Sequence, residues 1–475
     1  MLDVDEAKSP AEEAALPDAP LAFRDGEGDV NPVFVETVVS LTGSEDAEGL
    51  RALVSGLHEA DQGALLEALD NDDRIKLIAL LGDDFDFAAL TEVDDSVREE
   101  ILDELPAETV AEGIGDLESD DAVRILEDLD REEQEEILDA LPATDRVALQ
   151  KSLDYPEGSA GRLMQTDLIA VPPFWTVGQT LDFLQRDVDL PDSFFEVFVV
   201  DPGHRLLGHV FLDRLVRSGR EGPIEAIMAA DRRRVNVLDA GEDVARLFER
   251  YNVVSAPVVD EAGRLVGVVT IDDIVDVIQE EADDEIKALG GVSGDEELSD
   301  TVWTITRSRF VWLFVNLLTA FLASSVLGLF EGQLEKMVAL AVLAPIVASQ
   351  GGNAATQTMT VAVRALAVRE LGSGNAIRVT LRETIVGLLN GVGFGIITGV
   401  VASLWFHDWN LGLVIATAMT VNLVAGALGG ILIPLALDRY GADPAVSSGV
   451  FVTTVTDVVG FFAFLGIATL WFGLG

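Results

Sequence analysis

The chain has 475 residues and no cysteine, which excludes disulfide frameworks, thiolate metal sites and thiol catalysis. Its formal charge of −52 comes from 83 acidic and 31 basic residues, and so acidic a chain is not expected to bind nucleic acid, whose phosphates need a basic surface. The charge is unevenly distributed: residues 1–308 carry −51, whereas residues 309–475 carry −1 and are largely apolar. The sequence therefore predicts an acidic soluble half followed by a membrane half.

The acidic half begins with residues 1–32, which are rich in alanine, proline and acid and show no period, as is typical of a disordered tail. Residues 33–152 contain a repeat. Runs that begin Leu-acid-x-Leu occur at 66–70, 102–106 and 138–142, which is every 36 residues. A period of this length predicts stacked helix pairs and thus an α-superhelical amino-terminal domain. Its acidic faces either bind cations or are simply solvated, and the second interpretation is the more common for a charge run.

Residues 160–282 change to alternating strands and helices, and they contain a duplication. The runs VFVVDPGHRLLGHVFLDRLV and APVVDEAGRLVGVVTIDDIV align with each other. This duplication resembles an α/β CBS-domain pair, a regulatory module that commonly binds adenine nucleotides. Thr270 and Asp273 match the ribose-contacting pattern of that family, whereas the first repeat has Phe211 and Arg214 there. The resemblance implies ATP at one site at most, and the alternative is a purely structural pair.

A helix dense in acid connects the CBS pair to the membrane half. Helical spacing places Asp276, Glu280 and Asp283 or Asp284 on one face. Like charges on one helix face repel, each pair by a few tenths of a kcal/mol. We therefore expect salt or a divalent cation to offset this repulsion. The connecting segment is assigned to residues 283–307.

Residues 308–475 are predicted to form an all-α transmembrane domain with five helices. Five stretches without charge, or nearly so, reach the roughly 20 residues that cross a bilayer: 310–330, 337–363, 384–406, 409–437 and 444–475. Arginine gathers before the first stretch, between the second and third, and between the fourth and fifth, which is the same side of the membrane as the amino terminus. The positive-inside rule predicts a multi-pass protein of the cytoplasmic membrane, with its amino terminus inside and its carboxyl terminus outside. No apolar signal sequence precedes the acidic half.

The third stretch has a glycine at every fourth position, Gly387, Gly391, Gly395 and Gly399. This stripe predicts close approach of another helix, which is a packing signal and not a chemical one.

Asp457 is the one ionisable residue inside the five stretches. An aspartate at the bilayer centre costs roughly 2.5–3.5 kcal/mol on insertion scales and so is a candidate functional residue. Thr453, Thr454 and Thr456 surround it, and a mobile cation is its natural counter-charge. The second stretch adds Gln350-Gly351-Gly352-Asn353 and then Gln357. A site with only oxygen ligands suits hard divalent ions such as Mg²⁺.

Both motifs, and the domain order, resemble the MgtE family of magnesium channels and transporters over residues 33–475. The resemblance implies a homodimer with a pore between the membrane domains, in which Asp457 holds hydrated Mg²⁺ and Thr453 contributes backbone oxygen. It also implies regulatory acids in the CBS pair and the connecting helix, but it places none individually in the amino-terminal domain. The predicted pore residues are Asp457, Thr453, Thr454, Gly352, Asn353 and Gln357. The predicted sensor residues are Asp272, Asp276, Glu280, Asp283, Asp284 and Asp443.

The leading interpretation is a magnesium importer that cytosolic Mg²⁺ closes. Two alternatives stay open, a transporter of another divalent cation such as Co²⁺ or Mn²⁺ and a nucleotide-responsive receptor anchored in the membrane. An enzyme is not predicted, since none of the 4 histidines lies in a catalytic arrangement. The excess of acid together with only 5 lysines indicates adaptation to a salt-rich cytoplasm.

Overall fold

A computed structural model describes residues 21–127, 129–186, 190–191, 193–230, 233–294, 296–372 and 374–474, with the side chains of 446 and 447 excepted. The chain divides into two compact units, an amino-terminal unit that ends at Ile278 and a carboxyl-terminal unit that begins at Gln279. Each unit is described by itself. The fold class is the one expected: a helical domain, a CBS pair with two small sheets, and five long apolar helices.

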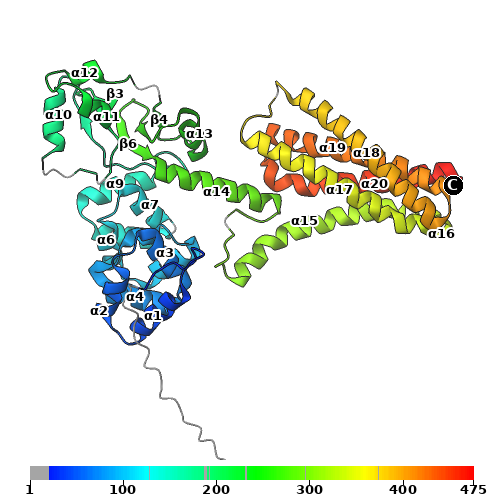
Figure 1. The fold of residues 1–475 in the computed structure, drawn as a ribbon, viewed down its shortest axis with the longest axis horizontal. Coiled ribbons are helices and arrows are strands. Elements are labelled where there is room, and N and C mark those ends of the chain that lie inside the picture. Colours follow the sequence, from blue (N-terminus) through cyan, green and yellow to red (C-terminus); the bar gives the residue numbers. More distant parts are fainter. Residues whose placement is uncertain are drawn as a thin grey trace, which may run out of the picture. The chain divides into compact units, whose positions relative to one another are not determined.

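The amino-terminal unit begins with a helical domain (Figure 1, blue to cyan). Its elements are α1 (Pro32–Gly43), α2 (Ala47–Val54), α3 (Glu59–Ala68), α4 (Asn71–Leu81), η1 (Gly82–Asp84), η2 (Phe87–Leu90), α5 (Asp95–Glu104), α6 (Ala107–Ile114), α7 (Ser119–Glu127), α8 (Arg131–Ala140) and α9 (Ala143–Leu153). The three repeat runs fall at the turns between α3 and α4, α5 and α6, and α8 and α9. Their leucines therefore recur because each run closes one helix pair onto a continuous apolar core.

Residues 21–32, which were expected to belong to a disordered tail, are ordered. Phe23 is 7% exposed and meets Phe34 of α1 edge to face at 5.2 Å between ring centroids. The amide of Asn31 donates to the carbonyl of Phe23, and the Asn31 side chain caps α1. Residues 21–31 are thus fastened to α1 by a buried aromatic pair. Residues 1–20 lie outside the described residues.

The CBS pair contains two three-stranded sheets with the same topology. The first has β1 (Ala170–Val171), β2 (Glu196–Val200) and β3 (Leu206–Phe211); the second has β4 (Val235–Asn236), β5 (Ser255–Val259) and β6 (Leu265–Thr270). In each sheet the middle strand pairs parallel with the first and antiparallel with the third. Both hairpins shift register at the corresponding place, Val199/Val200 and Val258/Val259. The duplication predicted from sequence is confirmed down to this irregularity.

The helices of the pair are short, and a long helix leaves it. They are α10 (Val177–Leu184), α11 (Leu212–Arg217), α12 (Ile224–Ile227) and α13 (Gly241–Tyr251). The long helix, α14 (Ile271–Leu289), begins directly after β6. The connecting helix therefore starts inside the second CBS repeat and ends at Leu289, earlier at both ends than residues 283–307.

The carboxyl-terminal unit is built from α15 (Val302–Gly328), α16 (Glu331–Lys336), α17 (Val338–Ala367), α18 (Ala376–Phe406), α19 (Trp409–Arg439) and α20 (Pro444–Phe472) (Figure 1, yellow-green to red). Five of these are long and apolar enough to cross a membrane. The first starts at residue 302, ahead of the expected 310, because the Thr301 side chain accepts from the amide of Thr304 and caps it there. We call residues 302–474 the membrane domain.

Within this domain α19 is the central helix. The predicted glycine stripe explains how closely α18 packs against it. A Cβ at Gly395 would lie 2.6 Å from the carbonyl oxygen of Ala416, and one at Gly399 would lie 2.7 Å from that of Gly412. Gly387 and Gly391 meet α19 as closely. The stripe is therefore the contact between α18 and α19, at a backbone distance that a side chain would prevent.

The stripe yields a stability prediction with a control on the same helix. We expect Gly395→Ala to destabilise the membrane domain by about 1–3 kcal/mol, the usual cost of overpacking. The matched variant Gly393→Ala should be neutral or slightly stabilising, since nothing lies within 4 Å of a Cβ there. Thermal unfolding of the two purified variants in detergent measures the difference. Equal melting temperatures would contradict the packing described.

Candidate ion pathway and acidic cluster

The first group of candidate residues lies on α20. Its first turn is capped by Asp443, whose carboxylate accepts from the amide of Ala445 at 2.7 Å. Asp457 lies in the middle of the helix and is half-buried. No described residue forms a hydrogen bond or an ion pair with its carboxylate. The predicted pore aspartate therefore lies in the middle of a candidate membrane span, with no counter-charge among the residues that the structure describes.

The threonines beside Asp457 have their hydroxyl protons engaged. Thr453 donates to the carbonyl of Gly449 at 2.8 Å, and Thr454 donates to that of Val450 at 2.7 Å. A hydroxyl that donates to the backbone keeps its oxygen lone pairs as acceptors. Thr453 is exposed and Thr454 is half-buried. This face of α20 thus offers oxygen to water or to a cation.

The second group lies on α17, and the structure brings part of it to α20. A Cβ built on Gly352 would lie 3.8 Å from the hydroxyl oxygen of Thr456, the residue before Asp457. The two sequence motifs are therefore adjacent at Gly352 and Thr456. Asn353 and Gln357 are exposed on α17 and form no hydrogen bond with another described residue.

The connecting helix ends against the helices that carry these motifs. Ala288 of α14 belongs to a buried apolar cluster with Ala355, Met359, Val363, Ala445 and Val452, and Leu289 packs against it. One turn earlier, Glu285 pairs with Arg364 of α17 at 3.2 Å. Glu280, Asp283 and Asp284 are exposed on the same helix. Asp443 lies two residues from Ala445, which belongs to this cluster.

The beginning of α14 takes part in an acidic cluster in the amino-terminal unit. Asp273 lies near Asp120 and Asp121 of α7, and Asp272 acts electrostatically on Asp121. Burial, and then the charge of Asp273, raise the pKa of Asp120 well above its usual range. Burial also raises the pKa of Asp121 to about 6 and that of Asp273 to about 7. Carboxyl groups held this close are partly protonated near neutral pH.

A third acid from the helical domain joins the cluster. Partial desolvation, and then the charges of Asp276 and Glu59, raise the pKa of Glu92. Arg124 of α7 pairs with Asp276 at 2.8 Å and offsets part of this repulsion. Among the described residues, no three carboxylate or histidine side chains converge closely enough to hold a metal ion. Cation binding to this cluster therefore requires some side-chain rearrangement.

Sequence reasoning missed Glu92, Asp120 and Asp121. Asp120 and Asp121 stand in the first turn of α7, where acids are common because they stabilise the positive end of a helix. Nothing in the sequence distinguishes Asp120, which is 8% exposed, from the many solvated acids of this domain. Only the packing of α7 against the CBS pair identifies it.

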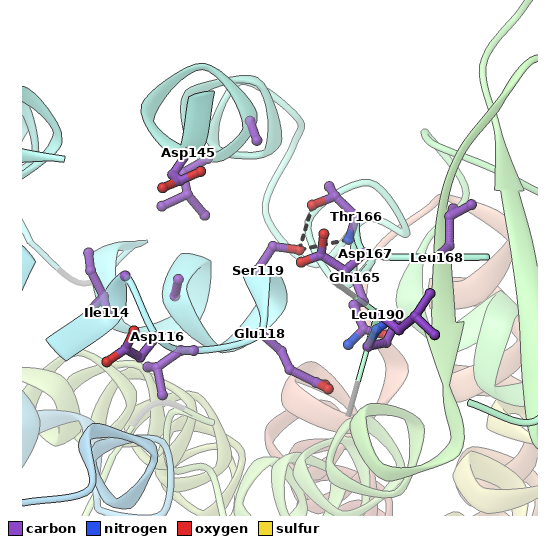
Figure 2. A pocket seen from close by; sticks show the side chains of 16 residues that line it. Ile114, Asp116, Glu118, Ser119, Asp145, Gln165, Thr166, Asp167, Leu168 and Leu190 are labelled. Carbon is purple, nitrogen blue, oxygen red and sulfur yellow. Dashed lines mark hydrogen bonds between the residues drawn. The ribbon is translucent and has the colours of Figure 1, made fainter. Parts of the chain in front are cut away.

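A polar cavity of about 450 Å³ lies next to this cluster (Figure 2). The turn between α6 and α7, helix α9 and segments 165–168 and 190–191 line it. Ser119 accepts hydrogen bonds from the amide and the hydroxyl of Thr166 at 2.7 and 3.0 Å, and these fasten α7 to the CBS pair (Figure 2, dashed lines). Asp116, Glu118, Asp145 and Asp167 also line the cavity, so the charged residues in its walls are all acidic.

One of the two predicted nucleotide residues, Thr270, lines a narrow cleft. Thr270 donates to the carboxylate of Asp273 at 2.7 Å. The cleft between the repeats, which Thr270 lines, measures about 20 Å³, whereas ligand sites are usually several hundred. Glu196 occupies part of it, buried, and accepts from Ser255 at 2.6 Å. A nucleotide would have to widen this cleft and tolerate a carboxylate inside it.

Three comparisons with known proteins agree with this architecture. The profile of the MgtE family, described as a divalent cation transporter, matches residues 344–467. The profiles of the MgtE intracellular N domain and of the CBS domain match residues 57–158 and 235–280. With five apolar helices that can span a membrane, these matches define a multi-pass membrane protein of divalent cation transport.

Curated relatives narrow the class. The magnesium transporter MgtE of Enterococcus faecalis is 33% identical over 426 residues, 89% of this chain and 93% of its own length. That of Bacillus subtilis is 28% identical over 88% of this chain and 93% of its own length. That of Thermus thermophilus is 34% identical over 332 residues, which are 68% of this chain and 72% of its own length. The chain therefore belongs to the MgtE family of magnesium transporters.

Two solved structures are also similar to the chain. The cytosolic domain of the Mg²⁺ channel MgtE in complex with ATP is 29% identical and covers 51% of this chain and 99% of its own, with a TM-score of 0.48. The soluble part of a magnesium transporter is 26% identical and covers 53% of this chain and 99% of its own, with a TM-score of 0.46.

Proposed function

We propose that this protein is a magnesium-selective channel that imports Mg²⁺ across the cytoplasmic membrane and that cytosolic Mg²⁺ closes. The observation that carries the proposal is Asp457, a carboxylate in the middle of a candidate membrane span without a counter-charge among the described residues, on a helix that touches the Gly352 motif of α17. Hydrated Mg²⁺ is the expected counter-ion, since it prefers oxygen ligands and retains much of its water shell. As in the resemblance, two copies would form the pore, with Asn353 and Gln357 also lining it.

The direct test is ion flux into liposomes that contain the purified protein. We expect Mg²⁺ uptake without added nucleotide or a proton gradient, and much slower uptake of Co²⁺. Uptake of Co²⁺ or Mn²⁺ in preference to Mg²⁺ would support the alternative substrate. The absence of any divalent flux would contradict the channel.

The topology gives a second test. Four arginines gather around the α17–α18 connection: Arg364 in the last turn of α17, Arg369 after it, and Arg378 and Arg382 at the start of α18. A side rich in arginine is expected to be cytoplasmic. We therefore expect a reporter fused after Gly475 to be active only outside the cytoplasm. Reporter activity inside would contradict the five-span orientation and the cytosolic sensor together.

The sensor is proposed to include Asp272, Asp276, Glu280, Asp283, Asp284 and Asp443. We add Glu92, Asp120, Asp121 and Asp273, because their raised pKa values support a cluster that binds protons when no metal is present. Metal binding to such carboxyls displaces those protons, so the two cations compete.

This competition predicts an unusual pH dependence. Carboxyl groups whose pKa is raised on folding stabilise the folded state only while protonated, so stability falls as pH rises through 6 to 7. Without Mg²⁺, we expect the purified protein to melt at a lower temperature at pH 8 than at pH 5.5. Millimolar Mg²⁺ should raise the melting temperature more at pH 8, where fewer protons must leave.

Two asparagine variants separate this effect from general titration. Asp273→Asn should weaken both the pH dependence and the stabilisation by Mg²⁺. Asp154→Asn, an exposed acid after α9, should behave like the wild type. If Asp273→Asn keeps the full dependence on pH and on Mg²⁺, the cluster is not a sensor site.

ATP binding to the CBS pair stays a prediction, with Thr270 and Asp273 at the ribose. The cleft must first widen, and the buried Glu196 carboxylate disfavours a nearby phosphate. Equilibrium binding of ATP to the wild type and to Thr270→Val tests it, with weaker binding by the variant as the expected result. Equal binding by the two would place the nucleotide elsewhere.

A further inference from the structure

A fully buried amide lies where three membrane helices meet. Asn422 of α19 is 0% exposed. Its Nδ2 donates to the carbonyl of Val347 on α17 at 2.8 Å. No donor among the described residues reaches its Oδ1. The middle of a long apolar helix thus contains a polar group that is only half satisfied.

Stability alone does not account for this side chain. A buried acceptor without a donor costs about 1–3 kcal/mol, which one neutral hydrogen bond from Nδ2 offsets only in part. An apolar side chain with suitably fitted neighbours would cost less.

Asn422 contacts a glycine on each of the two helices that carry the transport motifs. A Cβ at Gly351 of α17 would lie 2.0 Å from its Nδ2, and one at Gly460 of α20 would lie 2.7 Å from the same atom. Gly351 directly precedes Gly352, and Gly460 is one helical turn after Asp457. The amide therefore fits because both motifs have glycine at these positions.

The Asn422 side chain also fixes the position of α17 along its axis relative to α19. The carbonyl that accepts its hydrogen bond belongs to Val347, one helical turn before Gly351 on α17. One turn further along α19, Gly426 packs against the carbonyl oxygen of Gly351. A shift of α17 along its axis would break this bond and bring a side chain onto the amide. Such a shift would also separate Gly352 from Thr456, whose hydroxyl lies 3.8 Å from a Cβ at Gly352.

We propose that Asn422 is a positioning residue that holds the Gly351-Gly352-Asn353 segment of α17 at the level of Asp457 on α20, and that it thereby sets cation selectivity. The effect on selectivity rests on the proposed function, whereas the positioning of the two helices does not depend on it. Recognition of hydrated Mg²⁺ depends on the spacing of oxygen groups on the two helices, so a small slip between them should affect selectivity more than folding.

The absence of native cysteine allows the position of the helices to be measured without any ion flux. The pair Gly352→Cys/Thr456→Cys should form a disulfide on mild oxidation. A Cβ at Gly352 would lie 3.8 Å from the Thr456 hydroxyl oxygen, so small movements bring two sulfur atoms into bonding distance. Adding Asn422→Ala should slow this cross-link at least fivefold. The matched control is Thr420→Val, which removes a 3.0 Å bond from α19 to the carbonyl of Gly391 on α18. It should leave the cross-linking rate within twofold.

Selectivity is the second measurement. We expect Asn422→Ala, without the added cysteines, to lower the ratio of Mg²⁺ to Co²⁺ flux at least fivefold, whereas Thr420→Val should change it less than twofold. If Asn422→Ala does not fold, Asn422→Ser replaces it in both assays. Unchanged cross-linking in a folded Asn422 variant would overturn the positioning role. Slower cross-linking with an unchanged ratio would overturn the link to selectivity.

The two proposals fail in different ways. A wild-type protein without divalent flux would contradict the transport function, while the cross-linking comparison would still test Asn422. Flux with normal selectivity in a folded Asn422 variant would leave the transport function intact and overturn the link between Asn422 and selectivity.

Discussion

Replacement of Asp457 by asparagine is expected to lower Mg²⁺ flux by roughly a hundredfold. The variant keeps the size and one carbonyl oxygen of the side chain and removes its charge. At an effective dielectric constant near 20, unit charges about 4 Å apart attract by about 4 kcal/mol, and Mg²⁺ carries two. A water layer weakens the attraction, but a loss of about 2.7 kcal/mol is already a factor of a hundred. Flux into liposomes at fixed protein content measures it.

The matched control is Asp438→Asn. Asp438 is exposed near the end of α19, so the variant makes the same chemical change outside the proposed pathway. We expect its flux to stay within twofold of the wild type. Near-normal uptake by a well-folded Asp457→Asn protein would show that the cation passes elsewhere.

The second large effect concerns gating. We expect the triple variant Glu280→Gln/Asp283→Asn/Asp284→Asn to stay open at internal Mg²⁺ concentrations that close the wild type. These exposed acids lie on α14, whose end at Ala288 packs on α17 and α20, the helices with both transport motifs. We therefore expect a movement of α14 to reach the proposed pathway. Single-channel open probability against internal Mg²⁺ measures the effect.

The energy that the gate needs is available from a few weak sites. Moving a two-state gate from 1:99 to 99:1 takes about 5.5 kcal/mol of differential binding. A site at 100 times its dissociation constant supplies about 2.7 kcal/mol. Two or three cooperating sites are therefore enough, which fits a sensor that is spread over several acids.

Two controls distinguish specific binding from general charge effects. The variant Glu132→Gln/Glu135→Gln/Glu136→Gln makes the same change of net charge with exposed acids of α8, and it should close like the wild type. Monovalent salt of equal ionic strength should not close the channel, whereas simple screening predicts that it would. If the Glu280 triple variant closes at the same Mg²⁺ concentration as the wild type, these acids are only a solvated face.

Much of the architecture could be predicted from the sequence because it depends on local pattern. The five spans, the two matching hairpins and the leucine repeat of the helix pairs all follow from apolar periodicity, and the structure confirms each. The glycine stripe of α18 also indicated a close helix contact. Helix α15 begins eight residues before the first predicted span, since a threonine cap and not hydropathy sets the start of the helix.

Residue type and position alone identified Asp457 as a candidate, because a charge in an apolar span stands out whatever surrounds it. Only the tertiary structure indicated the further candidates. Asp120 and Asp121 look like ordinary helix-start acids until α7 packs against α14, when burial and nearby carboxylates raise their pKa values. Asn422 looks like an isolated amide until α17 and α20 each bring a glycine to it. Burial and contact between segments far apart in the chain depend on packing, and no local pattern records them.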